Sequence, residues 1–261
     1  MALDPTSGRW RTLPTEPGMS PAPDALIWTG KEAIVLRGGI TPGPQNGDYF
    51  GPLGSAYDPQ ANTWRFIHPL HVAAGQSDDL PDPRTRAGGQ AINAVWTGRQ
   101  VVVWGTGKSP PFAAAYHPST DLWQSVPFPD TTAAQEGIWT DEQLIVFEEG
   151  GAPFGYVIHP GDDSWAALPD VPGLEDPRTS IYGGSVVWTG ERVLFYGGYS
   201  HSAFLAWEPT SSRWIVHNPD RARLNGVAAW TGDELLLWGG CTTTGPDVDV
   251  AIWTPPPTDT E

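Results

Sequence analysis

The sequence predicts an all-β fold, a five-bladed β-propeller, and two recurring phrases carry that prediction. The first is Trp-Thr-Gly, or Trp-Thr-Asp in one copy, between two apolar runs; its tryptophans are Trp28, Trp96, Trp139, Trp188 and Trp230. The second is a large apolar residue, then Asp, His or Glu, then Pro, with Trp five positions later; its prolines are Pro5, Pro59, Pro118, Pro160 and Pro209. Copies of the first phrase lie 68, 43, 49 and 42 residues apart. Such spacing with strand-like content is typical of propeller blades.

Each repeat predicts four short antiparallel strands. In the second repeat, the β-rich runs Ala94–Trp96 and Val101–Trp104 flank the turn Thr97-Gly98-Arg99-Gln100, which predicts a hairpin. The second strand ends at closely spaced glycines, whose backbone adopts angles closed to other residues. A third strand leads into the proline turn, and a fourth carries the tryptophan of that turn. Four such strands form one blade, and no segment has a helical apolar period.

The two ends of the chain predict how the ring closes. Leu3–Leu13 has the pattern of a turn and a fourth strand, whereas the last repeat stops after a third strand at Val248–Trp253. We expect the N-terminal strand to join the last three strands, because closure removes exposed sheet edges. Residues 1–261 would then form a single propeller domain. The alternative is a fragment of a longer propeller.

The pattern resembles the kelch repeat of galactose-oxidase-like propellers, in a bacterial Trp-Thr-Gly form. The matching features are the double glycines, the aromatic residue before Asp-Pro at Tyr57 and the matching Tyr116, and the tryptophan after the turn. The resemblance implies a propeller, although kelch chains more often have six or seven blades. It leaves function open, because kelch propellers serve as scaffolds, peptide receptors and enzymes.

Composition excludes some functions. The formal charge is −16, with 30 acidic and 14 basic residues, which argues against nucleic-acid binding. No apolar stretch is long enough to span a membrane. Cys241 is the only cysteine, and we expect it to be structural and half-buried. We expect a monomer without cofactor or metal, and the sequence assigns no compartment.

The segments that do not repeat are the candidate binding elements. The fourteen tryptophans all fall within or at the ends of predicted strands. The loops between second and third strands, and between blades, vary and share one face, and such loops tend to carry binding residues. Arginines there could grip a carboxylate, unless they pair with acids of the same loops. We therefore predict a pocket at the channel mouth for an acidic peptide or small anionic ligand, formed by Arg84, Arg178, Arg223, Tyr49, Tyr182 and Tyr199.

Two alternatives to a binding module stay open. The resemblance to bacterial kelch propellers implies an enzyme acting on carboxylated sugars, of mutarotase or epimerase type. Glu136, at the entry of an innermost strand three residues before Trp139, is then the candidate catalytic carboxylate. The second alternative is a scaffold without its own ligand. The Cys-Tyr and Tyr-His pattern of kelch copper-radical oxidases is absent, since the one Tyr-His pair, at His117, lies in a repeated turn.

Overall fold

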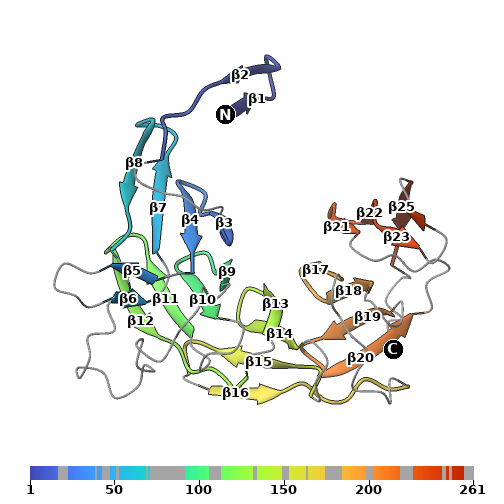
Figure 1. The fold of residues 1–261 in the computed structure, drawn as a ribbon. Helices are drawn as coiled ribbons and strands as arrows, with labels where there is room; N and C mark the ends of the chain where they lie inside the picture. Colours follow the sequence, from blue (N-terminus) through green and yellow to red (C-terminus); the bar gives the residue numbers. More distant parts are fainter. Residues whose placement is uncertain are drawn as a thin grey trace. The chain divides into compact units, whose positions relative to one another are not determined.

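The computed structural model describes residues 1–16, 23–38, 40–42, 48–50, 53–68, 70, 92–105, 113–131, 134–148, 153–162, 164–173, 184–197, 203–217, 226–242, 245–246 and 249–255. The described residues contain strands and turns but no helix. Five antiparallel sheets form the blades, as the sequence predicts, so the fold is a five-bladed β-propeller (Figure 1). Contacts divide the chain into two units, Met1–Val126 and Pro127–Glu261, which are described separately below.

Unit 1 holds blades 1 and 2 and an N-terminal hairpin of β1 (Ala2–Asp4) and β2 (Arg9–Arg11). Blade 1 has the strand order β3 (Ala25–Trp28), β4 (Ala33–Arg37), β7 (Leu53–Asp58) and β8 (Thr63–Phe66). Blade 2 has the order β9 (Ile92–Trp96), β10 (Val101–Gly105), β11 (Ala113–His117) and β12 (Leu122–Ser125). The long insertion of blade 1 contains a small hairpin that the sequence did not predict, β5 (Ile40–Pro42) with β6 (Asp48–Phe50).

Unit 2 holds blades 3, 4 and 5. Blade 3 consists of β13 (Ala134–Trp139), β14 (Leu144–Glu148), β15 (Gly155–His159) and β16 (Ser164–Ala167). Blade 4 consists of β17 (Ser185–Trp188), β18 (Val193–Gly197), β19 (Ala203–Glu208) and β20 (Arg213–His217). Blade 5 has three described strands, β21 (Val227–Trp230), β22 (Leu235–Trp238) and β25 (Val250–Trp253), and a short hairpin of β23 (Cys241–Thr242) and β24 (Gly245–Pro246).

The Trp-Thr-Gly phrase is a self-contained hairpin turn. In blade 1, Trp28 pairs with Ala33, and the turn between them is closed by Thr29, whose N–H and Oγ1 both donate to the carbonyl of Glu32 at 3.0 Å. The N–H of Glu32 donates back to Thr29 Oγ1 at 3.0 Å. The same pair of bonds to the carbonyl recurs at Thr97, Thr140, Thr189 and Thr231. The structural role predicted for this phrase is confirmed.

The proline turn is also built from its own residues. Asp58 Oδ1 accepts hydrogen bonds from the N–H groups of Gln60 and Ala61, which satisfies donors that the turn would otherwise leave unpaired. The residue two before the closing tryptophan has a positive φ, which Asn, Asp and Gly tolerate best. It is Asn62 (55°), Asp121 (57°), Ser212 (50°) or Gly8 (66°).

In blades 1, 2 and 4, the tryptophan that follows the proline turn ties the blade to the preceding segment. Trp64, Trp123 and Trp214 donate from Nε1 to the carbonyls of Pro14, His68 and Pro169, at 2.9, 2.7 and 2.8 Å. His68 and Pro169 follow the fourth strands β8 and β16, and Pro14 follows β2. By this contact β2 is equivalent to a fourth strand, as the sequence predicts.

The predicted pairing that closes the ring is not among the strand pairs of the described residues. There β2 pairs with β1, and β25 pairs with β22. Closure therefore stays a prediction, as does a single domain over residues 1–261.

The hydrophobic core lies between successive blades within each unit. The second strands β10, β14 and β18 are buried along their whole length, as in Val101–Gly105. One cluster joins β4 to β10 in unit 1, and two others join β14 to β18 and β18 to β22 in unit 2. This burial on both faces explains why second strands read as continuous apolar runs rather than alternating ones.

Candidate functional site

Most of the predicted pocket lies outside the described residues. Arg84, Arg178, Arg223, Tyr182 and Tyr199 all fall there, and of Tyr49 the structure describes only the backbone, in β6. No predicted ligand-binding residue is therefore tested. Cys241 is exposed, so the expectation of a half-buried thiol was wrong. The described part of the chain contains no group of His, Cys, Asp and Glu able to hold a metal, and no helix that could cross a membrane.

Glu136 is described, and its environment fits an acid–base role. It lies on β13 opposite Phe147, beside a β-bulge at the start of the strand. Its side chain reaches solvent but is surrounded by enough protein that burial raises its pKa. A raised pKa brings a carboxyl group closer to the range in which it can exchange protons.

Glu148, which the sequence reading did not single out, lies at the end of β14, on the neighbouring strand. This residue is only 8% exposed, and its Oε1 has no hydrogen-bond partner among the described residues. Leaving a buried carboxylate oxygen unpaired is unfavourable, so such atoms mark sites that bind something else or store strain. Glu136 and Glu148 both lie where the variable loops of blade 3 meet its strands.

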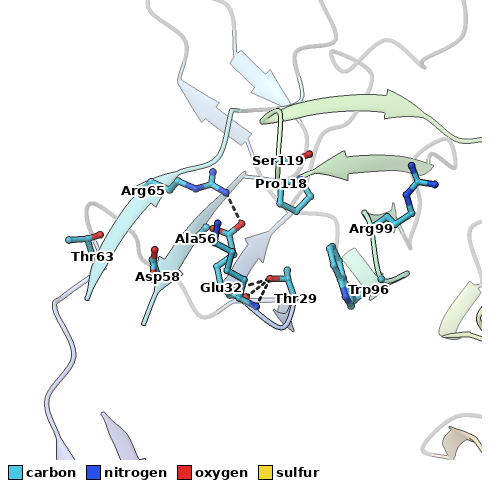
Figure 2. Close-up of a pocket in the computed structure, with 12 residues that line it drawn as sticks. Thr29, Glu32, Ala56, Asp58, Thr63, Arg65, Trp96, Arg99, Pro118 and Ser119 are labelled. Carbon is cyan, nitrogen blue, oxygen red and sulfur yellow. Dashed lines mark hydrogen bonds and ion pairs between the residues drawn. The ribbon is translucent and has the colours of Figure 1, made fainter. Parts of the chain in front are cut away.

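Unit 1 contains a cavity of about 490 Å³ between the Trp-Thr-Gly turns of blades 1 and 2, here called cavity 1. Figure 2 shows Arg65 and Asp58 on one side, Glu32 and Thr29 in the middle, and Trp96 and Arg99 on the other side. The remaining lining comes from Lys31, Ala56, Thr63, Gly98, Pro118 and Ser119. The cavity has the size of a small-molecule site.

Two of the five charged side chains in cavity 1 are bound to each other. Arg65 donates to Glu32 Oε1 at 2.8 Å and to the hydroxyl of Tyr116 at 3.0 Å. Asp58 is engaged in capping its turn, and the N–H groups of Ala61 and Gln60 hold its pKa below the usual range, with a smaller contribution from Lys31. The side chains of Lys31 and Arg99 are exposed and make no hydrogen bond or ion pair within the described residues.

A cavity of about 480 Å³ occupies the equivalent place between blades 4 and 5 of unit 2, here called cavity 2. Its Trp230 and Pro255 take the places of Trp96 and Pro118. Its charges differ, because Glu191 and Asp233 stand where cavity 1 has Lys31 and Arg99.

The junction of blades 3 and 4 carries a different arrangement. Here Trp188 takes the place of Trp96, and Asp141 takes the place of Gly30. Trp188 Nε1 donates to Asp141 Oδ2 at 2.9 Å. This bond joins the turns of blades 3 and 4, whereas cavities 1 and 2 separate the equivalent turns of blades 1 and 2 and of blades 4 and 5.

Comparison with known proteins supports the fold alone. No protein-family model matches the chain, and no curated protein matches it. Among solved structures, the one titled "Structure of YjhT" is similar, with a TM-score of 0.59 and 17% identity over 96% of this chain and 86% of that chain. At this identity the likeness shows a propeller fold. The chain is a β-propeller.

Sequence reading missed both cavities because it assigned the Trp-Thr-Gly turns to structure alone. The sequence does contain a signal, because a charged residue stands at the third position after each of these tryptophans. The residues there are Lys31 and Arg99 in unit 1, and Glu142, Glu191 and Asp233 in unit 2. Trp10, Trp28 and Trp238, also assigned to structure, are more than half exposed.

Proposed function

We propose that the chain is a binding module of the kelch type whose variable loops form a pocket for an acidic peptide or small anionic ligand. The propeller fold supports a binding or interaction role in general, because it is a rigid support for loops. The observation that carries the proposal is the set of five antiparallel blades, between whose strands the variable loops are inserted. Arg84, Arg178 and Arg223 would supply the contacts to the ligand's carboxylates.

The test uses two probes, a hexaglutamate peptide and glucuronate, with binding measured by calorimetry. Replacing Arg84, Arg178 and Arg223 by Ala should weaken binding at least tenfold, about 1.4 kcal/mol. The matched control removes the same kind of charge elsewhere, in Arg9→Ala and Arg213→Ala. Equal affinity of the triple variant and the control would contradict the proposal.

A second candidate function is an enzyme acting on carboxylated sugars, and the environment of Glu136 favours it. In mutarotation, the Glu136 carboxylate would take the proton of the anomeric hydroxyl as the bond between C1 and the ring oxygen breaks, and would pass that proton to the ring oxygen, which leaves as a hydroxyl. Closure on the other face of the aldehyde would reverse both transfers. The raised pKa of Glu136 suits both steps.

Saturation-transfer NMR on glucuronate tests this reading by comparing the rate of anomer exchange in variants. Glu136→Gln should remove the catalysed rate, whereas Glu142→Gln, in the exposed turn of the same blade, should keep it. Equal exchange by the parent and Glu136→Gln would exclude Glu136 as the acid–base group. No catalysed exchange by the parent would favour the binding module.

A further inference from the structure

We propose that cavity 1 is a second ligand site, for a small carboxylate attached to a ring or a short peptide. It lies between Trp-Thr-Gly turns, so it is distinct from the loop-built pocket proposed above. All its residues belong to blades 1 and 2 of unit 1.

The charge around cavity 1 opposes the charge of the whole protein. Three basic and two acidic side chains line it, in a chain of formal charge −16. Arg65 and Glu32 neutralise each other, and Asp58 is held by its own turn. Lys31 and Arg99, on the two turns that border the cavity, are the cations whose side chains make no hydrogen bond or ion pair within the described residues. Asp58 keeps its negative charge, so three basic and two acidic side chains leave a net charge of +1. Two cations without a bound acid attract an anion, and a guanidinium can bind a carboxylate through two parallel hydrogen bonds.

The rest of the lining would accept the body of such a ligand. Trp96 offers an aromatic surface and an indole N–H that makes no hydrogen bond within the described part of unit 1. Ala56 and Pro118 add apolar surface, and Thr63 and Ser119 add hydroxyl groups. In Figure 2 the Arg99 guanidinium extends past Trp96, away from Glu32, so engaging a ligand requires a rotation of this unpaired side chain.

Cavity 2 is an internal control for the effect of charge on binding in cavity 1. Cavity 2 has the same backbone frame and nearly the same volume, yet carries two acids and one arginine. That arginine, Arg192, is bound to Glu208 at 2.8 Å. Cavity 2 should therefore reject the carboxylates that cavity 1 accepts.

The junction of blades 3 and 4 suggests a substitution that would close such a cavity. Asp141 adopts a φ of 70° at the glycine position of its turn and accepts a hydrogen bond from the tryptophan of the next blade. Gly30→Asp would place the same group opposite Trp96, filling cavity 1 and adding a negative charge. Gly190→Asp makes the same change in cavity 2.

The test follows the Trp96 indole N–H by NMR of tryptophan-labelled protein, assigned with Trp96→Phe. Glucuronate and an N-acetylated aspartyl dipeptide are the two carboxylate probes, and glucose is the neutral control. The parent should show a saturable shift with at least one carboxylate and none with glucose. Gly30→Asp, and the pair Lys31→Glu with Arg99→Asp, should each weaken binding at least tenfold, about 1.4 kcal/mol.

Gly190→Asp should bind as the parent does, which controls for strain in the turn, and circular dichroism should confirm that both glycine variants fold. The proposal is overturned if neither carboxylate shifts the Trp96 signal, or if Gly30→Asp and Gly190→Asp bind alike. Replacing Arg84, Arg178 and Arg223 should leave this signal unchanged, so the outcome is independent of the loop-built pocket. Response to one probe alone identifies the ligand as a sugar acid or as a peptide.

Discussion

Asp141 holds a backbone position that the other four Trp-Thr turns give to glycine. Its φ is 70°, while Gly30, Gly98, Gly190 and Gly232 have φ between 88° and 114°. Residues with a side chain are disfavoured there, although Asp and Asn tolerate it better than others. The hydrogen bond from Trp188 offsets part of this cost at Asp141.

Gly98→Ala should therefore destabilise the protein by about 1–2 kcal/mol. An added Cβ would meet no atom within 4 Å, so the cost comes from the φ of 89° and not from a clash. Gly161→Ala is the control, because its Cβ also meets no atom and its φ is not positive. The free energy of unfolding, measured with urea, should fall for Gly98→Ala only. A similar loss in both variants would contradict the backbone explanation.

At the scale of the element, His217 at the end of β20 lies in an aromatic setting between blades 4 and 5. Its ring centroid is 4.9 Å from that of Phe204 and 5.4 Å from that of Trp253, and Nε2 is buried without a hydrogen-bond partner. Burial, and to a lesser degree the charge of Arg192, lower its pKa.

This environment predicts a pH-dependent stability. Because the pKa of His217 is lower in the folded state, the unfolded chain binds the proton more readily once the pH falls below about 6.5. The free energy of unfolding should therefore fall between about pH 7 and about pH 5, and fall less in His217→Gln and His217→Phe. Urea unfolding across this range measures the slope. Equal slopes in the parent and both variants would rule out His217 as a source.

The strands themselves were largely predictable, because each depends on local pattern. Val101–Trp104 was predicted as a second strand from its apolar run, and the strand is Val101–Gly105. A fourth strand was predicted within Leu3–Leu13, and the strand is Arg9–Arg11. The hairpin of β5 and β6 was missed, since Ile40–Phe50 is rich in Gly and Pro and lacks alternation. The third strand of blade 5 was predicted to begin at Val248, and β25 begins at Val250.

At the scale of the whole molecule, an excess of acidic residues is the dominant electrostatic feature. Because folding brings these charges closer together, the formal charge of −16 produces a repulsion that destabilises the folded state. Raising NaCl from about 0.02 M to about 0.5 M should screen this repulsion and raise the Tm. Each kcal/mol relieved corresponds to about 2–4 °C for a chain of this size. Scanning calorimetry at both salt concentrations checks this, and a lower Tm in high salt would show that local ion pairs dominate.

The site was less predictable than the fold. Glu136 was proposed from its place before a Trp-Thr phrase, and its catalytic role stays a prediction, although burial raises its pKa. Glu148 was missed because an acid at the end of an apolar strand gives no sign of burial. Cavity 1 was missed because it unites Lys31 with Arg99, 68 positions along the chain, through the packing of blades 1 and 2.

The self-contained hydrogen bonding of the Trp-Thr turn has a consequence for how this repeat diversifies. Thr29 and its four counterparts bond only to backbone groups of their turns. The third position after each tryptophan contributes at most its N–H, as at Lys31, Arg99 and Glu191, and its side chain takes no part in the closure. That side chain reads Lys, Arg, Glu, Glu and Asp along the chain. The same rigid turn thus presents opposite charges to cavity 1 and cavity 2 without any change in the hydrogen bonds that close it.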